Sequence, residues 1–252
     1  MEKNYLKNER NFRLSYVLNN GKPSAPILLL LHGFAGNKDE NGLFIEAEDY
    51  FSSKNFNVFR FDVEGAGESE GDYSLTSLRK QSNDLESTID YLTKTYPESK
   101  IGVVGFSLGA TVSILLNDSR IDAYGLWSPA LSPSEDMFPR YNTEEIRERL
   151  KSDGFLDKAG LKVGSAIIND LRDCKLQQNI QEINKPVLLI HGTADDKINY
   201  KTTNKFQNLF NKSKMVLIEG ANHSYKNNPL HRHLLFRENY SFFSNVFCAS
   251  IN

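Results

Sequence analysis

The chain has few cysteines and none of the long apolar runs that mark a disulfide-linked or membrane-spanning protein. Only two cysteines, Cys174 and Cys248, occur among its 252 residues, so we expect free thiols and no disulfide framework. The longest apolar run, Ile27–Leu31, is far too short to span a membrane. Both observations favour a compact globular protein that does not cross a membrane.

No charge of one sign dominates either, since 30 lysines and arginines stand against 32 acidic residues, for a net charge of −2. The basic residues are scattered and form no stripe, so we predict no nucleic-acid partner. Residues 1–5 lack the apolar core of a signal peptide, which predicts a cytoplasmic location. His231 and His233 have H-x-H spacing, but no further ligands at metal-site spacing accompany them, and we predict no metal site.

The most informative segment is the sequence Gly-Phe-Ser-Leu-Gly at residues 105–109. The apolar residues 101–104 before it predict a buried strand, and residues 110–116 after it predict a helix. A G-x-S-x-G sequence in this position is typical of a nucleophile elbow, a turn so sharp that its serine is strained. The positions two before and two after Ser107 must then be small, or strand and helix would collide. Ser107 is the candidate nucleophile.

Two further predicted strands are each followed by a candidate partner for a nucleophilic serine. Val187–Gly192 leads into a loop with Asp195 and Asp196, and residues 215–219 lead into a loop with His223. Asp195 stands four residues after a histidine at a strand end and is the preferred acid, although either carboxylate could reach the histidine. The resulting order of Ser, Asp and His is that of α/β-hydrolases and differs from the chymotrypsin and subtilisin orders.

Such a triad also needs hydrogen-bond donors for the oxygen that becomes negatively charged in the transition state. The strand Ile27–Leu31 runs into residues 32–36, where an oxyanion-hole loop is expected. The backbone N–H groups of Phe34 and Leu108 are the candidate donors. This mechanism needs no cofactor. The histidines His32 and His191 also end strands, and we expect them to be hydrogen-bonded within their loops and not catalytic.

The alternation of predicted strands and helices indicates an α/β fold, with a mostly parallel sheet covered by helices on both faces. One domain over residues 1–252 is expected, because open α/β sheets of this size are commonly single domains. The predicted strands are 12–18, 27–31, 57–61, 101–104, 123–127, 187–192 and 215–219, and the predicted helices are 43–51, 75–96, 110–116 and 230–247.

About fifty residues interrupt this alternation before Pro186, and we call residues 131–183 the inserted segment. Residues 143–150 carry a helix-capping pattern, and residues 163–171 predict a second helix. Because long loops in compact domains are usually functional, we predict a cap over the serine; an extra packing element is the alternative. The candidate substrate-binding residues are Trp127, at the end of the strand beside the elbow, and apolar side chains of the segment itself: Met137, Phe138, Tyr141, Phe155 and Leu156.

Along nearly its whole length the chain resembles the α/β-hydrolase superfamily, and within it the small bacterial esterases that include the cinnamoyl and feruloyl esterases. Ala66 and Asn199 depart from residues common in those relatives, at positions without a chemical role. The resemblance implies an α/β-hydrolase fold and a serine hydrolase. It rests on the motifs His-Gly-Phe at 32–34, Arg-Phe-Asp at 60–62, Gly-Ala-Gly-Glu-Ser at 65–69, the elbow at 105–109, His-Gly-Thr-Ala-Asp at 191–195 and Gly-Ala-Asn-His at 220–223.

We therefore expect a serine esterase that cleaves short-chain or aryl carboxylic esters through an acyl-enzyme, with a small-molecule ester as its partner. Thioesterase, monoacylglycerol-lipase-like and peptidase activities remain alternatives, because a triad alone does not separate them. A non-catalytic relative is disfavoured, since all three triad residues are present. The glycine-rich residues 65–71 superficially resemble a dinucleotide-binding loop, but four acidic side chains crowd the turn and would repel a pyrophosphate.

Overall fold

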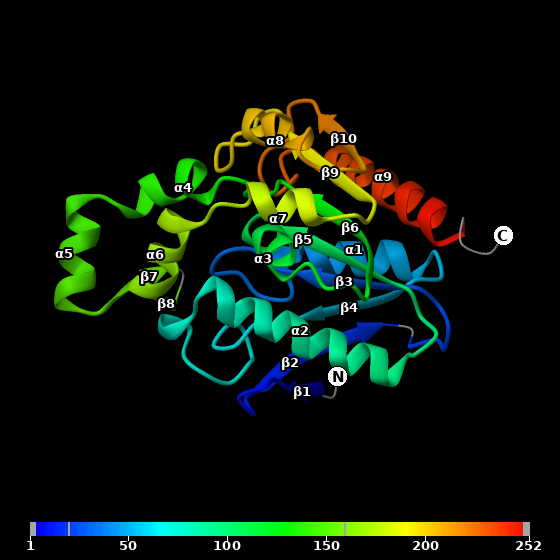
Figure 1. The fold of residues 1–252 in the computed structure, drawn as a ribbon, viewed down its shortest axis with the longest axis horizontal. Helices are drawn as coiled ribbons and strands as arrows, with labels where there is room; N and C mark the ends of the chain where they lie inside the picture. Colours follow the sequence, from blue (N-terminus) through cyan, green and yellow to red (C-terminus); the bar gives the residue numbers. More distant parts are fainter. Residues whose placement is uncertain (1–3, 20, 159, 249–252) are drawn as a thin grey trace.

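The computed structural model describes residues 4–19, 21–158 and 160–248, which build a mostly parallel eight-stranded sheet at the centre of the molecule (Figure 1). The strand order is β1-β2-β4-β3-β5-β6-β9-β10, and only the pairings of β2 with β1 and β4 are antiparallel. The strands are β1 (Asn4–Lys7), β2 (Arg13–Asn19), β3 (Ile27–Leu31), β4 (Asn57–Phe61), β5 (Ile101–Phe106), β6 (Ile121–Trp127), β9 (Val187–Gly192) and β10 (Ser213–Ile218).

Helices cover both faces of this sheet because its central strands are apolar on both sides. In β3, for example, Leu29 packs into the core on one face and Leu30 into the core on the other, and both side chains are fully buried. Helices α1 (Leu43–Ser52) and α9 (Pro229–Cys248) cover one face. The other face is covered by α2 (Leu78–Thr95), α3 (Leu108–Leu116), α7 (Gln177–Glu182) and α8 (Tyr200–Gln207). The predicted fold class is confirmed.

Local features such as helix capping explain where the helices and strands begin, including the places where the predicted boundary differs from the observed one. The helix expected from residue 75 begins at Leu78, because the Ser77 side chain caps it by accepting a hydrogen bond from the Lys80 N–H. The residues before this cap form a short 3₁₀ helix, η2 (Tyr73–Leu75). The edge strand β1 was not predicted, because four residues carry too little alternation to distinguish a strand from a loop.

The inserted segment, which lies between β6 and β9 in the sequence, folds into a small group of helices and strands of its own. In Figure 1 most of it lies at the left end of the molecule. The helix expected at 143–150 is confirmed, since the Thr143 hydroxyl accepts a hydrogen bond from the Ile146 N–H at the start of α5. The helix expected at 163–171 begins later, because Val163 belongs to an unpredicted hairpin. The segment contains α4 (Pro133–Asp136), η3 (Phe138–Tyr141), α5 (Glu144–Ser152), β7 (Phe155–Lys158), β8 (Leu161–Gly164), α6 (Ser165–Asp173) and α7.

Candidate active site

Ser107 occupies the sharp turn between β5 and α3 with backbone angles φ 53° and ψ −114°. A positive φ is unfavourable for a residue with a side chain and typically costs ~1–3 kcal/mol, so the surrounding structure must hold it in place. The Ser107 N–H donates to the carbonyl of Trp127 at 2.9 Å, and the Ser107 carbonyl accepts from the Ala130 N–H at 3.1 Å. These bonds to the end of β6 and to the loop after it fix the turn in the conformation expected of a nucleophile elbow.

The two glycines that flank the elbow leave no space for a side chain. A Cβ atom on Gly105 would lie 2.7 Å from the backbone of Ala110, at the start of α3. A Cβ atom on Gly109 would lie 2.3 Å from the carbonyl oxygen of Leu31, at the end of β3. Both obstacles are backbone atoms that cannot move aside, so the steric requirement inferred from the sequence is confirmed.

Asp195 and His223 come from the loops after β9 and β10 and are hydrogen-bonded to each other. His223 Nδ1 lies 2.7 Å from Asp195 Oδ2. The other carboxylate oxygen, Oδ1, accepts hydrogen bonds from the backbone N–H groups of Lys197 at 2.8 Å and Ile198 at 2.9 Å. Asp196, the alternative acid, is exposed and pairs with Lys197 Nζ. The structure thus brings Asp195, and not its neighbour, to the histidine.

The electrostatics of this pair favour an ionised Asp195. Burial by itself would raise the pKa of the carboxyl group, but hydrogen bonds from His191 and His223 and from the Ile198 N–H outweigh it, and the pKa is lowered. An ionised Asp195 accepts a hydrogen bond from the N–H at His223 Nδ1, which keeps the proton on that nitrogen and leaves the other ring nitrogen, Nε2, without a proton. A neutral histidine in this tautomer can act as a general base.

The other two histidines at strand ends are fully or almost fully buried and bonded within their loops, as expected. His191 Nε2 lies 3.0 Å from Asp195 Oδ2, and its Nδ1 lies 2.8 Å from the Thr203 hydroxyl. His32 Nε2 accepts from the Val63 N–H at 3.2 Å, and burial lowers the pKa of His32. His191 therefore helps to hold the same Asp195 oxygen, Oδ2, that His223 contacts.

Ser107 and His223 line one cavity of about 500 Å³, a size typical of small-molecule sites. The ring centroids of Phe106 and His223 are 4.9 Å apart, which fixes the histidine against the wall. Phe34 also lines the cavity. Leu108 is the first residue of α3, so its N–H belongs to the first helical turn, where such groups have no partner within the helix. The residues proposed from the sequence as oxyanion donors therefore flank the elbow.

The inserted segment contributes Met137, Arg140, Tyr141 and Lys158 to the lining of this cavity. Met137 and Tyr141 were expected there, whereas the sequence carried no signal for Arg140 and Lys158. Tyr141 packs edge-on against the Phe34 ring of the oxyanion loop, with ring centroids 5.1 Å apart. The segment thus meets the sheet domain directly beside the elbow.

Two side chains proposed for substrate binding lie elsewhere, and these expectations are corrected. Trp127 is fully buried on the face of the sheet covered by α1 and α9, where its indole N–H donates to Asn239 Oδ1 at 2.9 Å. Its ring packs there against Phe44 of α1 and Phe236 of α9. Phe138 packs against the hydrophobic core and is not among the residues that line the cavity. Leu156, also expected in the wall, lines a neighbouring cavity of about 460 Å³ together with Tyr141.

Glu40 is an acidic residue of the cavity that sequence reasoning missed. Its side chain is buried, and its Oε2 accepts the Gly33 N–H at 2.9 Å, beside the oxyanion loop. Burial raises the pKa of Glu40 to about 7, against the lowering effects of the Gly33 hydrogen bond and of Lys158. This carboxyl group is therefore only partly ionised at neutral pH.

Replacement of Glu40 by glutamine should remove a pH dependence of stability. The folded pKa of Glu40 is raised from 4.5 to about 7, so its favourable contribution is complete below pH 4.5 and is lost as the pH rises through about 7. As the pH rises from 4.5 to 8, the free energy of unfolding of the wild type should therefore fall by up to about 3 kcal/mol relative to that of Glu40→Gln. Urea denaturation across this range measures the difference; the exposed Asp49→Asn is the control, and a constant difference would contradict the prediction.

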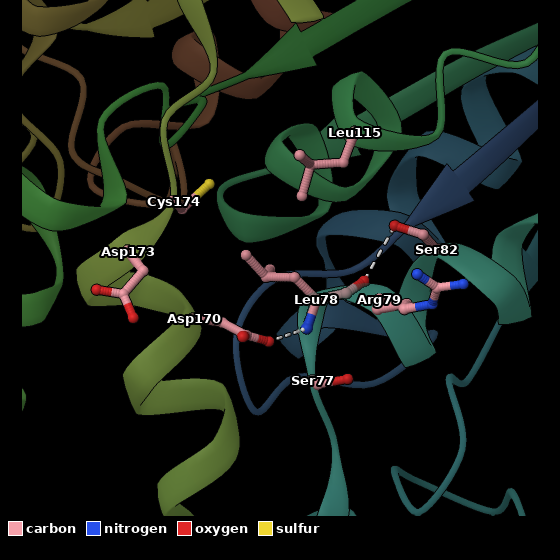
Figure 2. Close-up of a pocket in the computed structure, with 8 residues that line it drawn as sticks. All are labelled: Ser77, Leu78, Arg79, Ser82, Leu115, Asp170, Asp173 and Cys174. Carbon is pink, nitrogen blue, oxygen red and sulfur yellow. Dashed lines mark hydrogen bonds between the residues drawn. The ribbon is translucent and has the colours of Figure 1, made fainter.

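A separate cavity of about 430 Å³ lies where the start of α2, the end of α3 and α6 meet (Figure 2). Asp170 closes one side of it by accepting the Leu78 N–H at 2.7 Å, which caps α2. Cys174 also lines it, and burial raises the pKa of this thiol to about 12, which leaves it unreactive near neutral pH. The groups here serve helix packing and form no nucleophilic site.

Within residues 4–19, 21–158 and 160–248, no group of three or more His, Cys, Asp or Glu side chains is arranged to hold a metal ion. Across the same described ranges, no helix combines the length and the apolar character needed to cross a bilayer. The glycine-rich turn at 65–71 is occupied by protein groups, since Asp62 Oδ2 accepts the Glu68 N–H at 2.9 Å. The Glu68 N–H is therefore bonded to a carboxylate of the protein itself.

Known proteins resemble this chain in sequence and in structure. It is 26% identical over 202 residues to the lysophosphatidylserine lipase ABHD12 of Danio rerio, which covers 77% of this chain and 49% of that protein. The chain thus spans about half the length of that relative. It is 25% identical over 228 residues to the monoglyceride lipase homolog of Monkeypox virus, covering 78% and 81% of the two chains. The structure of Est1E from Butyrivibrio proteoclasticus with ferulic acid superimposes with a TM-score of 0.83 at 21% identity, over 97% and 99% of the two chains.

Residues 22–152, slightly more than half of the chain, match the family model described as serine aminopeptidase, S33. The matched region contains the candidate oxyanion loop, residues 32–36, and the elbow. The strand order and the structural likeness to Est1E agree with the α/β-hydrolase fold. The protein is therefore a hydrolase with the α/β-hydrolase fold and belongs to the serine aminopeptidase S33 family.

Proposed function

We propose that the protein is a serine esterase that hydrolyses carboxylic esters with Ser107, His223 and Asp195 as its catalytic residues. The observation that carries the proposal is the 2.7 Å contact between Asp195 and His223, in a cavity that is also lined by a serine held in an elbow conformation. Separate loops supply the three residues, so their convergence at one edge of the sheet is not a consequence of sequence proximity.

The chemistry follows from the proton positions. Ser107 Oγ attacks the ester carbonyl carbon while His223 Nε2 takes its proton, and the buried Asp195 carboxylate stabilises the imidazolium that forms. His223 then protonates the leaving alcohol, which departs to give an acyl-enzyme. Water attacks the acyl-enzyme with His223 again as base, and the acid product leaves. No cofactor takes part in this sequence.

Backbone N–H groups of Phe34 and Leu108 are proposed to stabilise the tetrahedral oxyanion. One such donor typically lowers the barrier by ~3 kcal/mol in other hydrolases. Both groups belong to the main chain, so substitutions at these positions test packing more than hydrogen bonding. The Lys158 ammonium lies over the Phe34 ring at 4.4 Å from its centroid, which helps to hold this loop.

The inserted segment, residues 131–183, is proposed to act as a cap that selects the substrate. Its support is the contribution of Met137 and Tyr141 to the cavity wall beside the oxyanion loop. A wall of this kind limits the size of the acyl or aryl group, because a filled pocket gains nothing from further methylenes. We therefore propose short-chain or aryl esters as the substrate class.

The descriptions of the relatives suggest other hydrolytic reactions, which an experiment must compare with ester hydrolysis. The family is described as a serine aminopeptidase family, and two relatives are described as lipases. A purified enzyme should hydrolyse aryl and short-chain oxygen esters with a higher kcat/KM than acyl thioesters, and peptide amides least of all. Steady-state rates on matched acetyl, butyryl and octanoyl substrates of each kind measure this order, with Ser107→Ala as the blank. A higher kcat/KM on thioesters or amides would replace the esterase proposal by the corresponding activity.

A further inference from the structure

Four positively charged side chains are among the residues that line the candidate active-site cavity. Arg140 and Lys158 come from the inserted segment, Lys197 from the loop after β9, and Lys226 from the loop before α9. The carboxylates in the same lining are those of Glu40 and Asp196. The cavity is therefore richer in cations than the chain as a whole, whose net charge is −2.

The carboxylates of the described lining neutralise Lys197 and leave Arg140, Lys158 and Lys226 without an ion-pair partner among them. Asp196 pairs with Lys197 at 3.0 Å, and buried Glu40 accepts the Gly33 N–H. In the described part of the chain, no carboxylate oxygen lies within 4.0 Å of Lys158 Nζ or of the Arg140 guanidinium. Arg140 instead donates to the backbone carbonyl of Asp136 at 3.1 Å.

Lys158 is held inside the cavity by aromatic groups instead of an anion. Its ammonium donates to the Tyr141 hydroxyl and lies 4.4 Å from the centroid of the Phe34 ring and 5.2 Å from that of Tyr141. An ammonium has three N–H donors, and the tyrosine hydroxyl takes one of them. A half-buried lysine with remaining donors beside the oxyanion loop is suited to bind an anionic oxygen.

We propose that the substrate is an ester that carries an anionic group, a carboxylate or a phosphate, and that Lys158 binds this group with help from Arg140. This inference rests on the proposed serine esterase and specifies its substrate class. The anionic group lies on the side of the substrate nearest Phe34 and Tyr141. Lys226, which is exposed and also lines the cavity, attracts the anion without fixing its position.

Matched pairs of esters test the proposal. On the acyl side, para-nitrophenyl hexanoate is compared with para-nitrophenyl hydrogen adipate, which ends in a carboxylate. On the alcohol side, methyl para-acetoxybenzoate is compared with para-acetoxybenzoate and with para-acetoxyphenyl phosphate. Each kcat/KM is divided by the uncatalysed rate, so that differences in intrinsic reactivity cancel. Together these comparisons show whether the negative charge of the preferred substrate is on the acyl or the alcohol side, and whether it is a carboxylate or a phosphate.

The wild-type enzyme should prefer the anionic member of at least one pair, and Lys158→Gln should lower that preference roughly 10- to 100-fold, mainly through KM. Lys158→Arg keeps the positive charge and should retain most of the preference. The control is Lys162→Gln on the same hairpin, whose ammonium lies over Phe155 and which is not in the cavity lining. This control should leave the preference unchanged.

The preference should also depend on pH, because an anion binds the protonated lysine. The pKa of Lys158 is lowered to about 8, first by burial and then by the positive charges of Arg140 and Lys197, with Glu40 opposing. Glu40, Arg140, Tyr141 and Lys197 are the charged and titratable groups that face it. The ratio of kcat/KM for the anionic and neutral esters should therefore fall as the pH rises through about 8 in the wild type, and not in Lys158→Arg.

Failure of this inference is distinct from failure of the esterase proposal. An enzyme that reacts with a fluorophosphonate and cleaves neutral esters, yet shows no preference for any anionic ester, would overturn the anion site alone. Equal losses on neutral and anionic esters in Lys158→Gln would also overturn it, because Lys158 would then only support the Phe34 loop. Loss of all ester hydrolysis by the wild type would reject the esterase proposal instead. A preference that responds to Lys158 would further tie the inserted segment to substrate choice.

Discussion

Replacement of Ser107 by alanine should abolish covalent labelling by a fluorophosphonate and lower kcat by roughly 10⁴- to 10⁶-fold on every substrate. The expected loss is this large because no acyl-enzyme can form without the serine oxygen. The remaining donors of the oxyanion hole would give only weak catalysis over water. Intact-protein mass spectrometry measures the labelling, and initial rates measure kcat.

Ser224 provides a matched control, since it and Ser107 are the two serines in the described lining of the cavity. Ser224→Ala should still be labelled, and peptide mapping of the labelled wild type should place the adduct on Ser107. Circular dichroism and a thermal melt establish that both variants are folded. Labelling that persists in folded Ser107→Ala would reject the serine-hydrolase mechanism as drawn.

Substitution of Asp195 by asparagine should lower kcat by about 10⁴-fold, an effect as large as the loss of the corresponding acid in serine proteases. The backbone N–H groups of Lys197 and Ile198 both point at Oδ1 and will hold the amide oxygen of the asparagine there. The amide NH₂ must then occupy the Oδ2 position and donate to His223 Nδ1. The proton of the neutral His223 ring must then be on Nε2. A protonated Nε2 cannot accept the proton of the Ser107 hydroxyl.

The neighbouring carboxylate gives the control for this substitution. Asp196 is exposed and pairs with Lys197, so Asp196→Asn should keep kcat within about threefold of the wild type. Turnover of a small neutral ester by both variants measures the difference. If Asp196→Asn were the inactive variant, the assignment of the acid would move to that residue and the contact seen with His223 would not be the catalytic one.

The features of this protein that could be predicted from the sequence are those that depend on a few consecutive residues. Residues 105–109, with a strand before them and a helix after, indicate an elbow, and Asp195 and His223 each follow an apolar strand. Because parallel strands end at one edge of the sheet, three such loops had to meet, and the structure shows Asp195 and His223 in contact. The order of the residues along the chain was therefore sufficient to predict the pair.

Strand β6 is buried on both faces of the sheet, and this explains why Trp127 was wrongly predicted to bind the substrate. The alternation of a strand shows which residues share a face, but it does not show which of two apolar faces each residue joins. Trp127 and the cavity lie near the same strand end, yet its side chain packs between α1 and α9 and bonds to Asn239. Only the packing of those two helices determined its direction.

The sequence by itself determined the fold class, the elbow and the positions of the candidate acid and base, because each depends on a short pattern and on the geometry that parallel sheets share. The tertiary structure decided the lining of the cavity, including Glu40 and Lys158. Lys158 belongs to a hairpin strand of four residues, too short to show a period, and it meets Phe34 only because the inserted segment packs against the loop that follows β3. Contacts between elements so distant in the chain arise from packing, for which no local pattern exists.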